Sequence, residues 1–261
     1  MEEEQMLTKE QILDMLDAGQ YKELKEELGN MYPVDIAETL EDFEQKPLVM
    51  VFRLLAKEEA AETFTYMNSD MREVLIGALT DSELEEVMEE MYLDDTVDVL
   101  EEMPANVVDR LLMVTDEETR AQINQLLQYP EDSAGSIMTT EYVDLREEMT
   151  VGQAMAHIKK TGIHKETIYT CYVTENNRKL VGMVSLRTLL FSEDEDVLEN
   201  IMESNVISVN TLEDQESVAQ MFTKYDFAAL PVVDQENRLV GIITVDDAID
   251  VLQEETTEDF E

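Results

Sequence analysis

The sequence has little positive charge, a single cysteine and no long hydrophobic run, and each of these shortages excludes a class of protein. The lone cysteine among 261 residues, Cys171, cannot form an internal disulfide, which is typical of a reducing compartment. No apolar run approaches the roughly 18 residues that a membrane-spanning helix needs, and no signal peptide is recognisable. The sequence therefore predicts that this chain is soluble and intracellular.

Positive charge is scarce, with 18 Lys and Arg residues against 62 Asp and Glu residues and a formal net charge of −44. Such a chain would repel a phosphate backbone or an anionic lipid surface, so nucleic acid and such membranes are excluded as partners. The hydrophobic content is nevertheless 44%, which is enough to form cores, and the length suits two or three domains. Cations are the partners that this composition favours.

An apolar pattern with a period of twelve residues runs through the first half of the chain. One column reads Leu40, Phe52, Phe64, Ile76, Met88, Leu100 and Leu112, and a second, three positions on, reads Phe43, Leu55, Met67, Leu79, Met91 and Met103. Apolar positions three apart are helical spacing, so each unit predicts one short helix and a connection. Stacked helical hairpins then predict an all-α superhelical solenoid over residues 1–130. Residues 7–30 add one or two amphipathic helices.

Helix starts are expected six positions before the first column, where Asp70, Ser82, Asp94 and Asn106 are typical N-cap residues. The unit at residues 93–98 is the most acidic of these, with Asp94, Asp95 and Asp98 within one helical turn. These three acids have two possible interpretations. The acids cap the helix and complement its dipole, or they form part of a site for a hard cation that another element completes.

The second half of the chain contains two copies of a similar sequence. Ile137-Met138-Thr139 is echoed by Ile201-Met202-Glu203, and Leu180-Val181-Gly182 by Leu239-Val240-Gly241. Each copy, of about 60 residues, predicts the order strand, helix, strand, turn, strand and helix. The last strand, residues 239–244, leads into a helix whose start is crowded with acids. Asp246, Asp247 and Asp250 share one face of that helix, where like charges are destabilising unless a cation lies between them.

The doubled unit resembles a pair of CBS domains, through Leu230-Pro231-Val232-Val233-Asp234 and the run Gly241-Ile242-Ile243-Thr244-Val245-Asp246-Asp247. An acidic superhelix before such a pair, with an acidic helix after it, resembles the cytosolic portion of the MgtE family of magnesium channels. The resemblance covers essentially the whole chain. It implies a superhelical N domain over residues 1–130, CBS domains over 131–197 and 198–253, and the start of a connecting "plug" helix over 254–261.

The resemblance also implies a function. Family members are homodimers through the CBS pair, they lie on the cytoplasmic face of the membrane, and a membrane domain absent from this chain follows. Their cytosolic parts sense Mg²⁺, which bridges acidic groups and closes the gate. The implied metal ligands are Asp94, Asp95 and Asp98 in the superhelix, Glu216, Asp226, Asp247 and Asp250 in the CBS pair, and Glu255, Glu258 and Asp259 in the plug helix.

CBS pairs often bind adenine nucleotides through Gly-x-x-[Ser/Thr]-x-x-Asp, so ATP is a second implied ligand. The second copy has the full set in Gly241, Thr244 and Asp247, whereas the first has Gly182 and Ser185 but carries Thr188 in place of the carboxylate. Phe227, Ala228 and Pro231 could form walls for an adenine.

No pattern supports catalysis. His157 and His164 have no partner at ligand spacing, and neither a phosphate-binding P-loop nor a nucleophile elbow is present. Cys171 lies in a strand run and is expected to be a buried, inert thiol. Two other functions remain open. One is a soluble CBS-pair sensor of adenine nucleotides, and the other is an acidic adaptor scaffold whose superhelix binds proteins.

Overall fold

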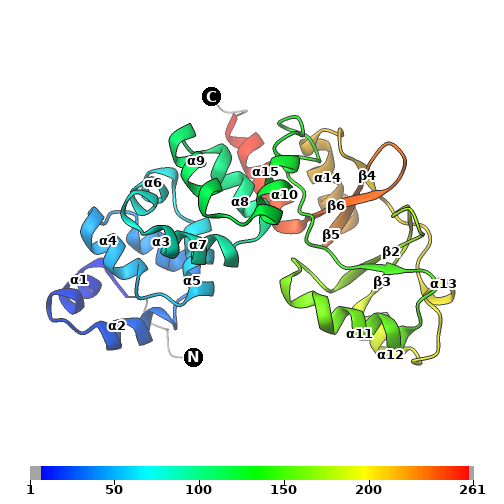
Figure 1. The fold of residues 1–261 in the computed structure, drawn as a ribbon, viewed down its shortest axis with the longest axis horizontal. Coiled ribbons are helices and arrows are strands. Elements are labelled where there is room, and N and C mark those ends of the chain that lie inside the picture. The colour runs from blue at the N-terminus through cyan, green and yellow to red at the C-terminus, as the bar shows by residue number, and fades with distance from the viewer. Residues whose placement is uncertain (1–6, 259–261) are drawn as a thin grey trace. The chain divides into compact units, whose positions relative to one another are not determined.

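The computed structural model describes the backbone of residues 7–258 and the side chains of residues 7–253. The chain forms two compact units, one made of residues 1–91 and 95–123 and the other of residues 92–94 and 124–261. Figure 1 shows helices over the described residues of the first part of the chain and two small sheets with their helices in the second. The predicted fold class, an all-α superhelix followed by two α/β units, is confirmed.

Within residues 7–258, the helical part begins with two helices that precede the twelve-residue repeat and continues with eight helices that are its units. They are α1 (Lys9–Asp17), α2 (Tyr21–Leu28), α3 (Pro33–Leu40), α4 (Gln45–Phe52), α5 (Lys57–Thr65), α6 (Ser69–Ala78), α7 (Asp81–Glu90), α8 (Leu93–Glu101), α9 (Ala105–Val114) and α10 (Glu117–Leu126). From α3 to α10 each helix starts twelve residues after the previous one. The twelve-residue period in the sequence is therefore the period of the structure.

The apolar columns form the core of this superhelix. Leu40, Phe64 and Ile76 of the first column are at most 2% exposed, as is Met67 of the second. The helices pack on their second neighbours, α3 on α5, α5 on α7, α7 on α9, and α4 on α6. Such packing between alternate helices is the arrangement expected for stacked helical hairpins.

The predicted N-caps are wrong by two residues. Asn68 caps α6, with its Oδ1 accepting a hydrogen bond of 3.0 Å from the Met71 amide, and Thr80 forms a capping box with Glu83 on α7. Asp70, Ser82, Asp94 and Asn106 are each the second residue of their helix instead. A short polar side chain suits both the cap and the first turn, because both positions lie near unpaired backbone N–H groups. The apolar period alone could not separate the two positions.

An ion pair with a depressed carboxyl pKa reinforces one of these caps. Arg53 Nε donates to Glu83 Oε1 at 2.7 Å, and the Thr80 amide donates to Glu83 Oε2 at 2.8 Å. The Arg53 hydrogen bond, followed by the Thr80 amide, lowers the pKa of Glu83 to about 2. Because this folded-state pKa lies below the unfolded value of about 4.3, the pair stabilises the fold above about pH 4.5, and this stabilisation is lost as the pH falls towards 2.

We expect Glu83→Gln to lower the free energy of unfolding by about 1 kcal/mol at pH 7, because the pair is partly exposed to solvent. The difference from the unmodified chain should shrink as the pH falls below about 4.5 and vanish only below about pH 2. The matched control is Glu86→Gln, which removes the Lys57–Glu86 pair at 3.2 Å, in which both side chains are about half exposed. Urea titrations at several pH values check this, and an equal loss in both variants at pH 7 contradicts it.

The second part of the chain contains two copies of a three-stranded unit. The first copy has β1 (Asp144–Arg146), α11 (Val151–Thr161), the 3₁₀ turn η1 (Gly162–His164), β2 (Thr170–Thr174), β3 (Leu180–Ser185) and α12 (Leu186–Phe191), followed by the short α13 (Leu198–Ile201). The second has β4 (Val209–Asn210), α14 (Gln215–Tyr225), β5 (Ala229–Val233), β6 (Leu239–Thr244) and α15 (Val245–Glu258). In each sheet the first strand pairs parallel with the second, and the second pairs antiparallel with the third.

The opening segment of each copy pairs with the last strand of the other. Thr139 N donates to Ile242 O at 2.8 Å, and Met183 N donates to Glu203 O at 2.9 Å. Side chains from both copies also share one core, formed by Tyr142, Tyr172, Leu180, Val233, Leu239 and Ile242. The two copies are therefore one folding unit, and the clefts between strand ends are built from both.

Candidate functional site

The acids of α8 differ in their access to solvent. Asp94 is only 7% exposed, Asp95 is half-buried and Asp98 is exposed. All three lie within the first two turns of the helix, where the positive end of the helix dipole favours carboxylates. An ion arriving from solvent would therefore meet Asp95 and Asp98 before Asp94.

The acids at the start of α15 are crowded. The Thr244 hydroxyl lies within hydrogen-bond distance of Asp246 and of Asp247, at 2.6 Å from Asp247 Oδ2, and the Thr244 amide donates to the same oxygen at 3.2 Å. Asp247 thus belongs to a capping arrangement as well as to the acidic face. Desolvation and then the neighbouring Asp246 carboxylate raise the pKa of Asp250. Nearby cationic charge would relieve this repulsion.

The remaining predicted metal ligands are distributed over the second copy and its last helix. Glu216 is exposed in the first turn of α14, and Asp226 is exposed at the end of that helix in the left-handed conformation, with φ of 55°. The side chains of Glu255 and Glu258 and all of Asp259 lie outside the described residues. Within the side chains that the structure describes, no three His, Cys, Asp or Glu residues converge as a ready-made metal site.

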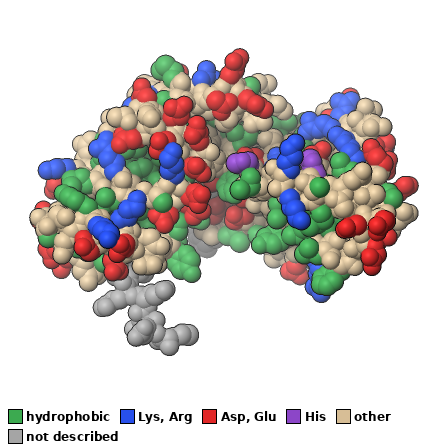
Figure 2. Space-filling model, turned by 60° about the horizontal axis from the view of Figure 1, so that its bottom comes forward, with side chains coloured by type: hydrophobic (Ala, Val, Ile, Leu, Met, Phe, Trp, Pro, Cys, Tyr) green, Lys and Arg blue, Asp and Glu red, His purple; other side chains and the backbone are tan. Residues whose placement is uncertain are grey.

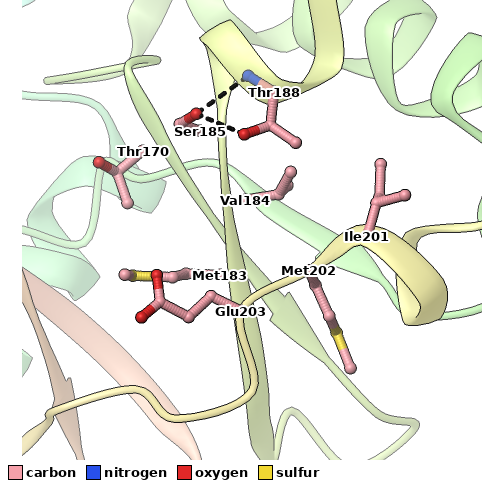
Figure 3. A pocket seen from close by; sticks show the side chains of 8 residues that line it. All are labelled: Thr170, Met183, Val184, Ser185, Thr188, Ile201, Met202 and Glu203. Atoms are coloured by element: carbon pink, nitrogen blue, oxygen red, sulfur yellow. Dashed lines mark hydrogen bonds between the residues drawn. The ribbon is translucent and has the colours of Figure 1, made fainter. Parts of the chain in front are cut away.

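A cavity of about 370 Å³ lies in the cleft of the first copy, between the end of β3, the start of α12 and the segment after α13. Its lining residues are Thr170, Met183, Val184, Ser185, Thr188, Ile201, Met202 and Glu203. Figure 3 shows the Ser185 and Thr188 side chains together at one end, and the Met183 and Glu203 side chains at the other. The cavity combines hydroxyl groups, thioether walls and one carboxylate, within the usual volume range of small-molecule sites.

The hydroxyl pair in this cavity takes the place of a hydroxyl–carboxylate pair in the second copy. Ser185 and Thr188 hydroxyls lie 2.8 Å apart, and the Thr188 amide donates to Ser185 Oγ at 3.0 Å. The equivalent residues of the second copy are Thr244 and Asp247. The first cleft therefore offers no carboxylate at the position where the second has one.

The other predicted nucleotide-binding residues lie near the start of β5. The Phe227 ring lies 5.4 Å from the Tyr225 ring and 6.4 Å from that of Phe222, while Ala228 is exposed and Pro231 is buried in the strand. Of the cavity lining, the sequence motif identifies Ser185 and Thr188 but gives no sign that Thr170 and Glu203 line the same cavity. The echo between residues 137–139 and 201–203 was the available signal for Glu203, because it marks the segments that pair across the copies.

Cys171, His157 and His164 lie on elements that carry none of the predicted metal ligands. Cys171 is fully buried, and its burial raises the pKa of the thiol to about 12, so it stays protonated as an inert core residue. His157 and His164 lie on α11 and η1. None of the helices within residues 7–258 is both long and apolar enough to cross a membrane.

Family models and solved structures show which class of protein this chain resembles. Residues 31–132 match the model of the MgtE intracellular N domain, and residues 134–194 and 198–254 match that of the CBS domain. A crystal structure of the cytosolic domain of the Mg²⁺ channel MgtE in complex with ATP superposes with a TM-score of 0.87 at 37% identity, covering 92% of this chain and 98% of that one. The soluble part of a magnesium transporter gives a TM-score of 0.84 at 33% identity, covering 94% and 96%.

Curated relatives agree. The magnesium transporter MgtE of Thermus thermophilus is 38% identical over 95% of this chain and 56% of its own length, and that of Bacillus subtilis is 32% identical over 96% and 55%. The chain thus spans about half the length of these relatives. It belongs to the MgtE family, is homologous to the family's cytosolic part, and combines an N domain with a CBS pair. This is a family of transporters and not of enzymes, as the sequence predicted.

Proposed function

We propose that this chain is the magnesium-sensing, regulatory portion of a magnesium channel or transporter. Mg²⁺ bridges acidic groups of the superhelix, the CBS pair and the plug helix, and so closes the gate of a membrane domain that follows. The observation that carries this proposal is the homology to the cytosolic domain of a Mg²⁺ channel, combined with a net charge of −44. The proposed domains are the N domain (residues 1–130), the two CBS domains (131–197 and 198–253) and the start of the plug helix (254–261). We propose that they lie at the cytoplasmic face of the membrane.

The donor groups fit Mg²⁺. The candidate ligands are all carboxylates, and hard oxygen donors are what Mg²⁺ prefers, commonly with several retained waters. Two carboxylates about 6 Å apart repel by about 0.7 kcal/mol in water and by about 3 kcal/mol at an effective dielectric constant of 20. The raised pKa of Asp250 beside Asp246 is a local sign of this repulsion. An ion that binds several carboxylates binds more tightly to the compact state, in which they lie closest together, than to the open state. This difference in affinity lets Mg²⁺ switch the chain between the two states.

Small-angle scattering of the chain, titrated with MgCl₂, tests the proposal. We expect the radius of gyration to fall over the millimolar range. The control is a titration with KCl at the same ionic strength, which screens charges without bridging them. An envelope that does not change with Mg²⁺, or that changes equally with K⁺, contradicts the proposal and favours an acidic scaffold.

We also propose that the chain forms a homodimer through its CBS pair. Four apolar side chains of the first copy are strongly exposed: Ile163 (81%), Tyr169 (74%), Leu190 (61%) and Phe191 (85%). Leu190 and Phe191 end α12, and Tyr169 O accepts a hydrogen bond from the first amide of that helix. Exposed apolar side chains on adjoining segments, as at Tyr169 and α12, are typical of protein interfaces.

Phe191→Ser should weaken the dimer at least about tenfold, because burying one phenyl group contributes on the order of 1.5–3 kcal/mol. The matched control is Met113→Ser, since Met113 of α9 is 74% exposed but belongs to the superhelix. Sedimentation equilibrium of the three chains measures this. A monomeric unmodified chain, or the same loss in both variants, contradicts the proposed interface.

Nucleotide binding is a second candidate function, because the first copy holds a cavity and a 37%-identical relative was crystallised with ATP. We propose that ATP binds the CBS pair, with weak recognition of the ribose in the first cleft because Thr188 cannot accept hydrogen bonds from both ribose hydroxyls as a carboxylate does. Thr188→Asp should tighten ATP binding about tenfold, whereas the uncharged Thr188→Asn should not. Isothermal titration decides this, and no change with Thr188→Asp contradicts the assignment of the cleft.

A further inference from the structure

Arg72 of α6 is a buried cation with three hydrogen-bond partners, two backbone carbonyls and one carboxylate. Its side chain is 9% exposed, its Nε donates to Phe64 O at 3.2 Å, and its Nη2 donates to Thr65 O. Both carbonyls belong to the last turn of α5, where backbone acceptors lack helical partners. Nη1 donates to Glu102 Oε2 at 2.7 Å, directly after the end of α8. Arg72 therefore joins three helices of the superhelix around one fixed positive charge.

Two other arginines make the same kind of connection but in a more exposed setting. Arg110 donates to Ile76 O, Leu79 O and Asp81, and Arg53 donates to Ala78 O and Glu83. Their side chains are 31% and 45% exposed. An arginine that binds carbonyls at the end of a helix together with one carboxylate is thus a recurrent structural element of this superhelix.

Arg72 differs from the other two in the charges that surround it. Burial lowers the pKa of its guanidinium, and the carboxylates of Glu102, Asp98 and Asp95, in that order, act against this lowering. Asp95 and Asp98 are the solvent-accessible acids of α8 in the proposed magnesium response. Geometry agrees, because the Glu102 amide donates to Asp98 O at 3.3 Å, and Asp95, Asp98 and Glu102 are spaced three and four residues apart on one face of α8 and its end. The guanidinium that binds Glu102 is therefore on the same side of α8 as its candidate ligands.

We propose that Arg72 is a positioning residue that sets the Mg²⁺ concentration at which the superhelix responds. It holds α8 against α5 and α6, and it partly neutralises Asp95 and Asp98 before any ion arrives. A divalent ion must then bind against a fixed positive charge. We expect the Coulomb repulsion between a fixed unit charge and a divalent ion in a highly polar medium to raise the threshold about fivefold. This inference rests on the proposed magnesium-sensing function.

The test compares Arg72→Met, Arg72→Lys and Arg110→Met in the scattering titration with MgCl₂. Arg72→Met should compact at about fivefold lower Mg²⁺, whereas Arg72→Lys, which keeps the charge, should stay within twofold of the unmodified chain. Arg110→Met loses the equivalent carbonyl bonds and should also leave the midpoint unchanged. A purely structural role would lower the thermal stability of both Met variants without moving either midpoint, and that result overturns the inference.

A second variant keeps the inference testable if Arg72→Met fails to fold. Glu102→Gln retains the bonds from Arg72 to the α5 carbonyls but leaves its charge unbalanced, so the midpoint should rise about twofold to threefold. Glu83→Gln, which removes the matching acid from Arg53, should not move it. If the unmodified chain compacts with Mg²⁺ but the midpoints of the Arg72 and Glu102 variants do not shift, this inference is overturned and the proposed function stands. No response of the unmodified chain overturns the proposed function and this inference with it.

Discussion

Replacing Asp95 by Asn should raise the Mg²⁺ concentration needed for compaction at least about tenfold. The substitution removes one negative charge and one carboxylate donor from the accessible face of α8 while preserving the size of the side chain. Asp95 is half-buried at the third position of its helix, so its side chain remains partly accessible to solvent. The measurement is the midpoint of the radius of gyration against MgCl₂ concentration.

The repeat supplies a matched control for this experiment. Asp35 occupies the third position of α3, five repeat units earlier, and is also half-buried. Asp35→Asn therefore makes the same change in charge and in interaction with the helix dipole, at a position that the account does not assign to Mg²⁺. Its midpoint should match that of the unmodified chain. If both substitutions shift the midpoint equally, net charge and not a local site controls the response.

Gly241→Val should destabilise the CBS pair by at least about 3 kcal/mol, the largest effect on stability that we expect from a single substitution. A Cβ at Gly241 would lie 2.5 Å from Met138 Sδ and 2.8 Å from Thr139 O. The methionine could move, but the Thr139 backbone is fixed by its hydrogen bonds to Ile242 in β6. The added side chain would therefore separate the opening segment of the first copy from the sheet of the second.

Two other glycines provide the comparisons. The equivalent Gly182 faces Met202 Sδ at 2.5 Å but a backbone oxygen only at 3.1 Å, so Gly182→Val should cost less than Gly241→Val. Gly77 of α6 has no atom within 4 Å of an added Cβ, and Gly77→Ala should stabilise by about 0.5–1 kcal/mol. Urea unfolding followed by circular dichroism gives this ranking. A Gly241→Val chain as stable as the unmodified one contradicts the proposed role of the close approach.

Much of the fold could be predicted because the sequence repeats. The buried columns recur every twelve residues, and the run Leu239–Thr244 is a strand with the predicted limits. The opening strands were less predictable. In the first copy β1 spans only Asp144–Arg146, and the preceding Tyr142 packs into the core shared by both copies. Apolar residues at a strand boundary do not reveal whether they pair with a neighbour or fill a core.

The candidate sites were predictable only in part, because their residues come from distant parts of the chain. Acids within one helical turn are visible in the sequence, as are the paired motifs around Ser185 and Thr244. The contact of Arg72 with Glu102 joins residues 30 positions apart, and the cavity of the first copy combines β3 with residues 201–203. Such contacts depend on how the helices and the two copies pack, and no local pattern encodes them.

Diffraction from crystals of this chain grown with Mn²⁺, which shares the octahedral oxygen coordination of Mg²⁺ and scatters anomalously, tests the central claim most directly. The account predicts anomalous peaks within about 2.2 Å of, or one water away from, carboxylate oxygens of Asp95 or Asp98 and of Asp226, Asp247 or Asp250. These peaks should disappear when excess Mg²⁺ is added. Peaks confined to other surface acids, or no peaks at millimolar Mn²⁺, would contradict the claim that these carboxylates form the magnesium sensor.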